Sequence, residues 1–317
     1  MPAAKVSCDS QTKGNKVRIL LPVDGSTFSK AAVAFIASRK ALIQSQPDVE
    51  LINVQYPVPP RAARAAGREL VLGYYKSEAD KAVRPALAKL KRAGLQARVK
   101  YVVGNPGKEV SKIAATEAVD LIVMGSHGRT GLTKLLFGSV THSVLASCTT
   151  PMLVLRDDAI AKKDSLKLGI ALDGSKYGIA AVNYFIEHLD LFGESPAITL
   201  IHVVPDLSKL VVPGVFSDGP VLGFKPQQIE AMHGAAFERA MAPARKLLGR
   251  TQVQATESRL IGNNAGDEIA AYATKNKLDL LVMGSHGAGA LDSAALGSVA
   301  MRVAARCQLP LLFVRGK

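Results

Sequence analysis

The sequence contains one pattern twice, and this internal repeat constrains the fold more than any other feature of the chain. Residues 18–26 (RILLPVDGS) return as residues 167–175 (KLGIALDGS), and residues 120–128 (DLIVMGSHG) return as residues 279–287 (DLLVMGSHG). We therefore predict two tandem copies of one domain, residues 1–158 and residues 159–317, joined by a short charged linker at 157–163. The second copy carries ten extra residues after its second predicted strand.

Short apolar runs alternate with amphipathic stretches of helical spacing in each copy. The expected strands are residues 17–23, 49–56, 98–103, 120–124 and 152–155 in the first copy, and 168–172, 198–204, 252–261, 278–283 and 311–314 in the second. The expected helices are residues 30–43, 69–93, 108–117 and 134–146, then 177–191, 227–248, 267–274 and 293–305. Apolar strands separated by helices are typical of a parallel sheet covered on both faces. We therefore predict an α/β fold with one five-stranded, doubly wound domain per copy.

Three features of each copy fall at the carboxyl ends of predicted strands, where open parallel sheets bind ligands. An aspartate followed by Gly-Ser comes after the first strand, and a valine ends the second strand. A segment with the spacing G-x2-G-x9-G-S follows the fourth strand. These residues are Asp24, Val54, Gly125, Gly128, Gly138 and Ser139 in the first copy, and Asp173, Val203, Gly284, Gly287, Gly297 and Ser298 in the second.

The glycine-rich segment has the chemistry of an anion site. Glycines let the backbone approach a phosphate closely and adopt positive φ, and successive free N–H groups form an anion-binding concavity. Gly138 and Ser139 open a predicted helix, where the helix dipole favours negative charge. The simpler interpretation is that Gly125 and Gly128 only make a tight turn. The presence of the whole spacing twice favours anion binding.

These motifs resemble the nucleotide-binding signature of the ATP-binding branch of the universal stress proteins, and the resemblance covers nearly the whole chain as two tandem domains. It implies a Rossmann-like sheet of order 3-2-1-4-5 with ATP or ADP across the strand ends, together with Mg²⁺ or Mn²⁺. Asp24 and Val54 would lie at the adenosine. Gly125, Gly128, Gly138, Ser139 and Val140 would hold the ribose and phosphates, and Met124 from the preceding strand would also belong to the site. Their counterparts are Asp173, Val203, Met283, Gly284, Gly287, Gly297, Ser298 and Val299.

The two copies differ inside the nine-residue spacer. The first copy has Arg129 and Lys134 there, which would add two cations near the phosphates, whereas the second copy has no cation and one acid. We therefore expect Arg129 to belong to the first site and the first copy to bind nucleotide more tightly.

The sequence favours a nucleotide-binding regulator or sensor of the stress response over a metabolic enzyme. Neither copy has the Gly-Lys-Ser/Thr of a P-loop, and no acid or base accompanies His127 or His286 in sequence, so a loop or capping role is expected for both. Slow ATP hydrolysis or autophosphorylation is compatible with this interpretation. The alternative is an ATP-dependent transferase or hydrolase of the same fold.

The net charge of +14 suggests an anionic partner, because residues 1–158 carry +11 and residues 159–317 only +3. Arginines 61, 64 and 68 have helical spacing, so they form either a solvated helix face or a docking surface for an acidic partner or nucleic acid. The chain has no Trp and 5% aromatic residues, which argues against stacking on single-stranded nucleic acid.

The remaining expectations concern assembly and location. The last strands of the two copies, residues 152–155 and 311–314, would pair in an internal pseudo-dimer, since they would otherwise be exposed apolar edges. A further homo-oligomer and a protein partner are compatible with the sequence. The polar first residues lack the apolar core of a signal peptide and no membrane span is evident, so we expect a cytoplasmic protein. The apolar loop 205–226 is interpreted as a lid, a partner surface or a loop packed on its own domain. Cys148 and Cys307 are expected to be buried, and Cys8 to be the reactive thiol.

Overall fold

The computed structural model describes residues 16–128, 137–157, 159–207, 225–287 and 296–315. The strands of the first copy are β1 (Arg18–Pro22), β2 (Asp48–Gln55), β3 (Ala97–Val103), β4 (Leu121–Gly125) and β5 (Met152–Leu155). Those of the second are β6 (Lys167–Ala171), β7 (Ala197–Val204), β8 (Ala255–Ile261), β9 (Leu280–Gly284) and β10 (Leu311–Val314). Each strand coincides with a predicted strand, although several are shorter than expected.

The helices of the first copy are α1 (Thr27–Ser38), α2 (Lys40–Gln44), α3 (Pro60–Ala66), α4 (Arg68–Arg92), α5 (Pro106–Thr116) and α6 (Ser139–Ser147). Those of the second are α7 (Lys176–Glu187), α8 (Pro226–Leu248), α9 (Ala265–Lys275) and α10 (Ser298–Arg306), and two short 3₁₀ turns are η1 (Ala159–Lys162) and η2 (Leu189–Leu191). The single predicted helix 30–43 is wrong, because Arg39 adopts extended backbone between α1 and α2. The helices expected from residues 134 and 293 begin instead at Ser139 and Ser298.

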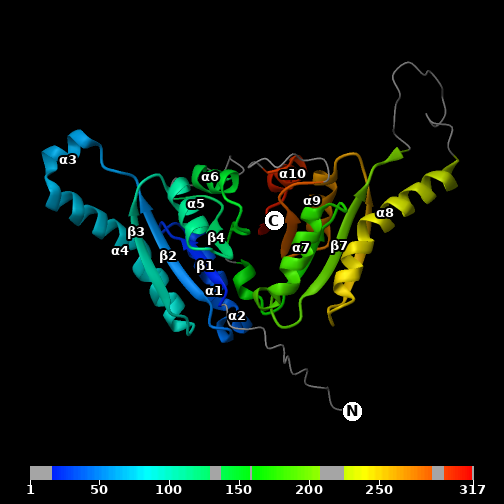
Figure 1. The fold of residues 1–317 in the computed structure, drawn as a ribbon, viewed down its shortest axis with the longest axis horizontal. Helices are drawn as coiled ribbons and strands as arrows, with labels where there is room; N and C mark the ends of the chain where they lie inside the picture. The colour runs from blue at the N-terminus through cyan, green and yellow to red at the C-terminus, as the bar shows by residue number, and fades with distance from the viewer. Residues whose placement is uncertain (1–15, 129–136, 158, 208–224, 288–295, 316–317) are drawn as a thin grey trace, which may run out of the picture.

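All strands join in one ten-stranded sheet of order β3-β2-β1-β4-β5-β10-β9-β6-β7-β8 (Figure 1). Pairing is parallel within each copy, so the order 3-2-1-4-5 is confirmed in both. The join is the antiparallel pair β5–β10, with Leu312 opposite Leu153. The last strands therefore pair across the repeat, as the sequence predicts.

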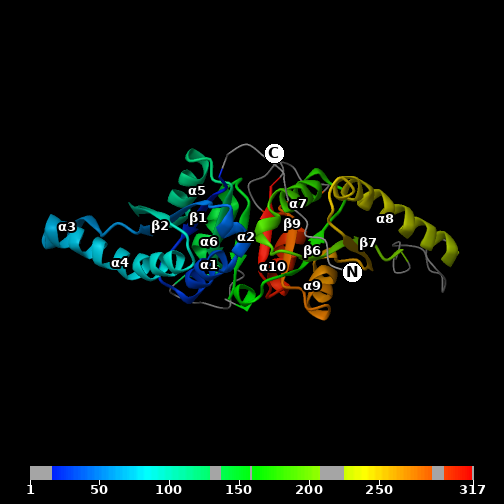
Figure 2. The same cartoon turned by 90° about the horizontal axis from the view of Figure 1, so that it is seen from below.

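Helices cover both faces of this sheet (Figure 2). Alternate residues of β1 enter different cores: Ile19 and Leu21 pack with α1 and α4, whereas Leu20 packs with α5 and α6. The second copy repeats this arrangement with α7 and α8 on one face and α9 and α10 on the other. Among the described residues, no helix combines the length and apolar character needed to cross a bilayer.

The linker between the copies is fixed by a buried arginine. The Arg39 side chain is almost fully buried, and its Nη2 donates to the carbonyl oxygen of Lys163 at 2.5 Å and to that of Ile160 at 3.4 Å. Burial lowers the pKa of the Arg39 guanidinium. The same side chain that interrupts the first helix therefore holds η1 against α1.

Candidate functional site

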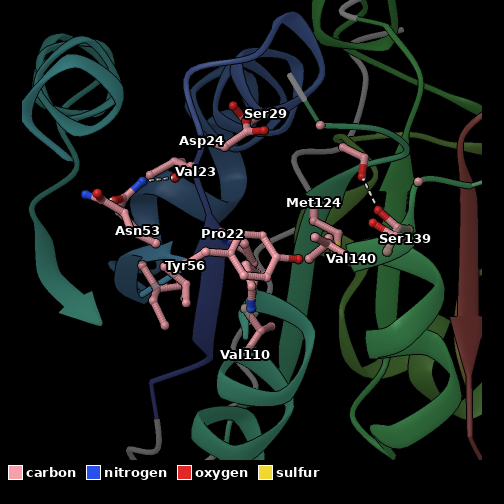
Figure 3. Close-up of a pocket in the computed structure, with 18 of the residues that line it drawn as sticks. Pro22, Val23, Asp24, Ser29, Asn53, Tyr56, Val110, Met124, Ser139 and Val140 are labelled. Carbon is pink, nitrogen blue, oxygen red and sulfur yellow. Dashed lines mark hydrogen bonds between the residues drawn. The ribbon is translucent and has the colours of Figure 1, made fainter. Parts of the chain in front are cut away.

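A cavity of about 590 Å³ opens at the carboxyl ends of β1, β2 and β4 in the first copy (Figure 3). This volume lies within the range of small-molecule sites. Eight of the residues predicted for the first site line the cavity: Asp24, Val54, Met124, Gly125, Gly128, Gly138, Ser139 and Val140. The ninth, Arg129, lies outside the described residues, as does Lys134.

The turn after β1 fixes the carboxylate of Asp24. Gly25 has a φ of +82°, which glycine adopts without the steric cost of a Cβ atom. The amide of Ser26 donates to Oδ1 of Asp24 at 3.0 Å, and the Ser26 hydroxyl accepts from Ser29 N at 3.1 Å, capping α1. A Cβ atom added to Gly128 would lie 3.1 Å from Oδ2 of Asp24. The turn thus places this carboxylate directly beside the second motif glycine.

The motif glycines provide space rather than unusual backbone angles. Gly125, Gly128 and Gly138 do not have positive φ, so that part of the sequence interpretation is wrong. A Cβ atom on Gly125 would lie 2.5 Å from Cβ of Phe28, and one on Gly138 would lie 3.2 Å from Cα of His127. Gly125 therefore lets β4 approach α1, and Gly138 lets the start of α6 approach the turn after β4.

The start of α6 supplies backbone donors to the cavity. The Gly138 amide donates to Ser126 O at 2.8 Å, and the Thr141 hydroxyl donates to Gly125 O at 2.8 Å, which fixes the helix against the end of β4. No side chain caps α6 within the described residues, whereas Asn105 caps α5. The first N–H groups of a helix lack intrahelical partners and favour anions. This end of the cavity is thus suited to a phosphate.

The other end of the cavity is formed by β2 and α4. Nδ2 of Asn53 donates to Val23 O at 2.7 Å, a contact visible in Figure 3, and Gln55 donates to Oδ1 of Asn53 at 3.1 Å. Tyr56 and Tyr74 line the cavity while 60% and 53% exposed. Sequence reasoning missed these residues, because the position of α4 over the sheet is set by packing rather than by a motif.

The described lining of the cavity has an acidic character. It includes the carboxylates of Asp24 and Glu78, and it includes no Lys or Arg side chain from the described part of the chain. Apolar side chains fill the wall between the phosphate end and β2; these are Val54, Val110, Met124 and Val140. The arrangement suits a ligand with an apolar planar part and an anionic part, the latter met by backbone N–H groups.

The second copy repeats this geometry closely. Ser175 N donates to Oδ1 of Asp173 at 3.0 Å, a Cβ atom on Gly287 would lie 2.9 Å from Oδ2 of Asp173, and Gly297 N donates to Ser285 O at 2.7 Å. The predicted residues of this copy therefore occupy positions equivalent to those in the first; they are Asp173, Val203, Met283, Gly284, Gly287, Gly297, Ser298 and Val299.

The lining of the two sites is not identical. His202 replaces Asn53, and its Nδ1 lies 2.7 Å from the carbonyl oxygen of Leu172. Because that carbonyl can only accept, Nδ1 of His202 donates this hydrogen bond. Ala300 replaces Thr141, so the hydroxyl that ties α6 to β4 has no counterpart in α10. The second site therefore offers different polar groups on the same backbone frame.

The two motif histidines have structural contacts. Each is buried, with Nδ1 of His127 3.0 Å from Oγ of Ser126 and Nδ1 of His286 2.9 Å from Oγ of Ser285. The His127 ring packs against Phe28 with ring centroids 5.4 Å apart. These contacts support the expected loop role.

Comparison with known proteins agrees with the repeat and the fold. The model of the universal stress protein family matches residues 17–156 and again residues 166–315. A universal stress protein of Mycolicibacterium smegmatis is 25% identical over 307 residues, covering 94% of this chain and 96% of that protein. YxiE of Bacillus subtilis is 29% identical over 147 residues, 44% of this chain and 98% of its own length.

Two further comparisons concern a shorter segment and a solved structure. Universal stress protein MJ0577 of Methanocaldococcus jannaschii is 45% identical over 67 residues, which span 21% of this chain and 41% of that relative. The crystal structure of a universal stress protein from Archaeoglobus fulgidus aligns with a TM-score of 0.65 and 21% identity over 94% of this chain and 98% of its own, a likeness of fold. With both halves matched by the family model, the chain belongs to the universal stress protein family as a tandem two-domain member.

Proposed function

We propose that the protein binds ATP or ADP in both copies and acts as a stress-response regulator or sensor. The observation that carries the proposal is the convergence, on one cavity of about 590 Å³, of the uncapped start of α6, the Asp24 carboxylate and an apolar wall. The phosphates would meet the N–H groups of α6, and the adenosine would lie between Val54 and the β1 turn. The second copy would use its equivalent residues.

A regulator fits the site better than a metabolic enzyme. The titratable side chains of the described lining are Asp24, Glu78, His127, Tyr56 and Tyr74, and the one imidazole among them is buried against Ser126 and Phe28. ATP hydrolysis by the purified protein at about 1 s⁻¹ or faster would favour the transferase or hydrolase alternative.

A divalent cation would reach the site with the nucleotide. Mg²⁺ is commonly held by one or two carboxylates together with substrate phosphates, and Asp24 and Glu78 provide the carboxylates of the described lining. Within the described residues no group of three or more His, Cys, Asp or Glu side chains forms a metal cluster. The donor set fits Mg²⁺ or Mn²⁺ bound jointly by phosphate and Asp24, where the cation would offset the negative charge of both.

Calorimetric titration with ATP and ADP, with Mg²⁺ and with EDTA, tests the proposal. Asp24→Asn keeps the shape of the side chain and should change the metal dependence, whereas Gly128→Val should abolish binding at the first site. Because a side chain on Gly128 also meets Asp24, the free energy of unfolding is measured for each variant. Gly73→Ala is the matched control, since a Cβ atom there meets nothing within 4 Å. Unchanged affinity in Gly128→Val would refute the site assignment.

The expected ranking of the two sites is tested in the same titrations. In Gly287→Val only the first site should still bind nucleotide, and in Gly128→Val only the second site should. The two single variants therefore report the affinity of each site separately. The ranking was inferred from Arg129 and Lys134, and the lid hypothesis from residues 205–226; both cations and residues 208–224 lie outside the described residues. Equal affinities in the two variants would contradict the ranking alone.

A docking role is a second candidate function, favoured by the segment 60–76, here called the basic arm. Figures 1 and 2 show α3 and the start of α4 projecting beyond the sheet, and α3 has no buried residue. Within the described residues no ion pair involves Arg61, Arg64 or Arg68, and Leu70 is 67% exposed. Binding of RNA or DNA at two salt concentrations tests it, since binding driven by phosphates weakens steeply with salt.

A further inference from the structure

Two arginines cross the boundary between the copies at equivalent positions. Arg156 follows β5, and its Nη2 donates to Ala304 O in the last turn of α10 at 2.7 Å. Arg315 follows β10 and donates in the same way to Leu145 O in the last turn of α6. Cations at a helix C-terminus satisfy the free carbonyls and interact favourably with the dipole. The helices α6 and α10, whose N-termini carry no side-chain cap, are thus each capped at the C-terminus by an arginine of the other copy.

The start of α6 also contacts the second copy. Phe137 directly precedes Gly138, and its buried ring meets the buried ring of Phe313 edge-on, with centroids 6.3 Å apart. Phe313 and Arg315 are two residues apart at the end of β10, and side chains at this spacing in an extended chain lie on the same side. The last strand of the second copy therefore holds α6 before its first residue and again near its last turn.

The reverse contacts are weaker. Leu296 and Val154 stand at the positions equivalent to Phe137 and Phe313, so no aromatic pair exists there. The Arg156 guanidinium lies 5.5 Å from the centroid of the Phe137 ring, so Arg156 contacts the residue before α6 as well as capping α10. Both copies are joined symmetrically by the arginines and asymmetrically by the rings.

We propose that Phe313 and Arg315 of the second copy are positioning residues for the phosphate end of the first site, a proposal that rests on the proposed nucleotide binding. α6 has nine residues, and helices this short are not stable alone. Its orientation is therefore set by its contacts, and those contacts include both ends of the helix and the second copy. Phosphate binding needs the N–H groups of Ser139 and Val140 in one orientation. Loss of the contacts of Phe313 or Arg315 with α6 therefore lowers the nucleotide affinity of the first site.

The environment of Arg315 strengthens its contact. Arg315 is half-buried, and this burial lowers the pKa of its guanidinium. A hydrogen bond from a charged donor is stronger than one between neutral groups, and Leu145 itself is buried. Arg315→Met removes this bond but keeps a long side chain, and Arg315→Lys restores a cationic donor.

The chain has no Trp, so a single introduced Trp reports on one site. Leu70→Trp places it on the exposed surface of α4, four residues before the lining residue Tyr74, and Met232→Trp places it on the exposed surface of α8 in the second copy. Energy transfer to N-methylanthraniloyl-ADP then gives the Kd of each site in the full chain. We expect Phe313→Leu and Arg315→Met each to raise the Kd of the first site about three- to tenfold, the range for an aromatic pair and a fraction of that for a charged hydrogen bond. The Kd of the second site should change less than twofold, and Arg315→Lys should recover most of the loss.

The matched control is Phe192→Leu. Phe192 is fully buried in the second copy against Phe185, with centroids 5.2 Å apart, and it belongs to the core on the face of the sheet away from α6. It loses the same atoms as Phe313→Leu without touching α6. A comparable fall in stability with an unchanged first-site Kd separates positioning from general destabilisation.

A readout without nucleotide separates this proposal from the proposed function. The amides of Gly138 and His142 donate to Ser126 O and Gly138 O at 2.8 and 2.9 Å. Their hydrogen exchange should accelerate about three- to tenfold in Phe313→Leu and Arg315→Met, while exchange at Gly297 and Met301 stays unchanged. Unchanged exchange and Kd in both folded variants would overturn the positioning role. If the parent chain binds no nucleotide but exchange is accelerated in the two variants, the proposed function is overturned and the positioning of α6 stands.

Discussion

Replacing Gly125 with alanine tests whether the first motif glycine serves packing or ligand approach. The added Cβ atom would lie 2.5 Å from Cβ and 2.6 Å from the carbonyl carbon of Phe28. The second of these is a main-chain atom of α1, so no side-chain rotation relieves the clash. β4 is buried along its whole length, so the strand has no free space to retreat into. Overpacking of this kind costs about 1–3 kcal/mol. We expect Gly125→Ala to lower the free energy of unfolding by about 2 kcal/mol.

Urea unfolding followed by circular dichroism measures this change. Gly284→Ala should behave alike, because its Cβ atom would lie 2.7 Å from Cβ of Tyr177. Gly73→Ala lies on an exposed helix surface and should gain about 0.5–1 kcal/mol, because alanine has the higher helix propensity. A Gly125→Ala variant within about 0.5 kcal/mol of the parent, the usual effect of a neutral surface substitution, would refute the packing argument.

Three further predictions concern buried polar groups. Arg39→Met leaves two linker carbonyls, including that of Lys163, without their donor, and should lower the free energy of unfolding by about 1–3 kcal/mol; unchanged stability would contradict this. Burial is the main cause that raises the pKa of Glu50, so its stabilising contribution is complete below the unfolded pKa of about 4.3 and is lost as the pH rises through the folded pKa. Glu50→Gln should therefore gain stability over the parent from pH 4 to pH 7, and a constant difference across that range would rule it out. Burial raises the pKa of Cys307, so iodoacetamide should label this thiol slowly in the native protein, and rapid labelling would argue against its burial; Cys8 lies outside the described residues and stays the predicted first site of labelling.

Most strands were predictable from sequence because they are apolar runs, whereas the edge strands β3 (ARVKYVV) and β8 (ATESRLI) mix apolar and polar residues. Residues 152–155 and 311–314 are strands as expected, since a run of four apolar residues beside a turn has few other buried conformations. The break in the helix expected at 30–43 was not predictable. It occurs at Arg39, whose side chain donates hydrogen bonds to linker carbonyls that lie 121 and 124 residues away in sequence.

Some residues of the candidate site could be predicted from the sequence and others could not. The residues of the glycine motif could be placed in the site because the carboxyl ends of parallel strands converge at one edge of the sheet. The same spacing of these residues also occurs in both copies. Tyr56, Tyr74 and Glu78 could not, because they reach the cavity through the packing of α4 and the exit of β2. The signal for Arg156 and Arg315 was present, since an arginine follows the last strand in both copies. The role of these arginines could not be predicted, because each one contacts a helix of the other copy.

Fusion of the two copies in one chain explains how the sites can differ. Two identical chains in a symmetric dimer must share every substitution, so a change that helps one site alters the other as well. Here the pairing of β5 with β10 buries the apolar edges of both copies, as a dimer interface would. Because the copies share one chain, a residue in one copy can change without a change at the equivalent position of the other. Phe137 faces Phe313 on one side of the join, whereas Leu296 and Val154 stand on the other. The start of α6 thus has an aromatic contact from the second copy that the start of α10 lacks, whereas an arginine from the other copy caps both helices. An asymmetric join of this kind allows the two sites to differ in affinity, which the titrations of the single variants measure.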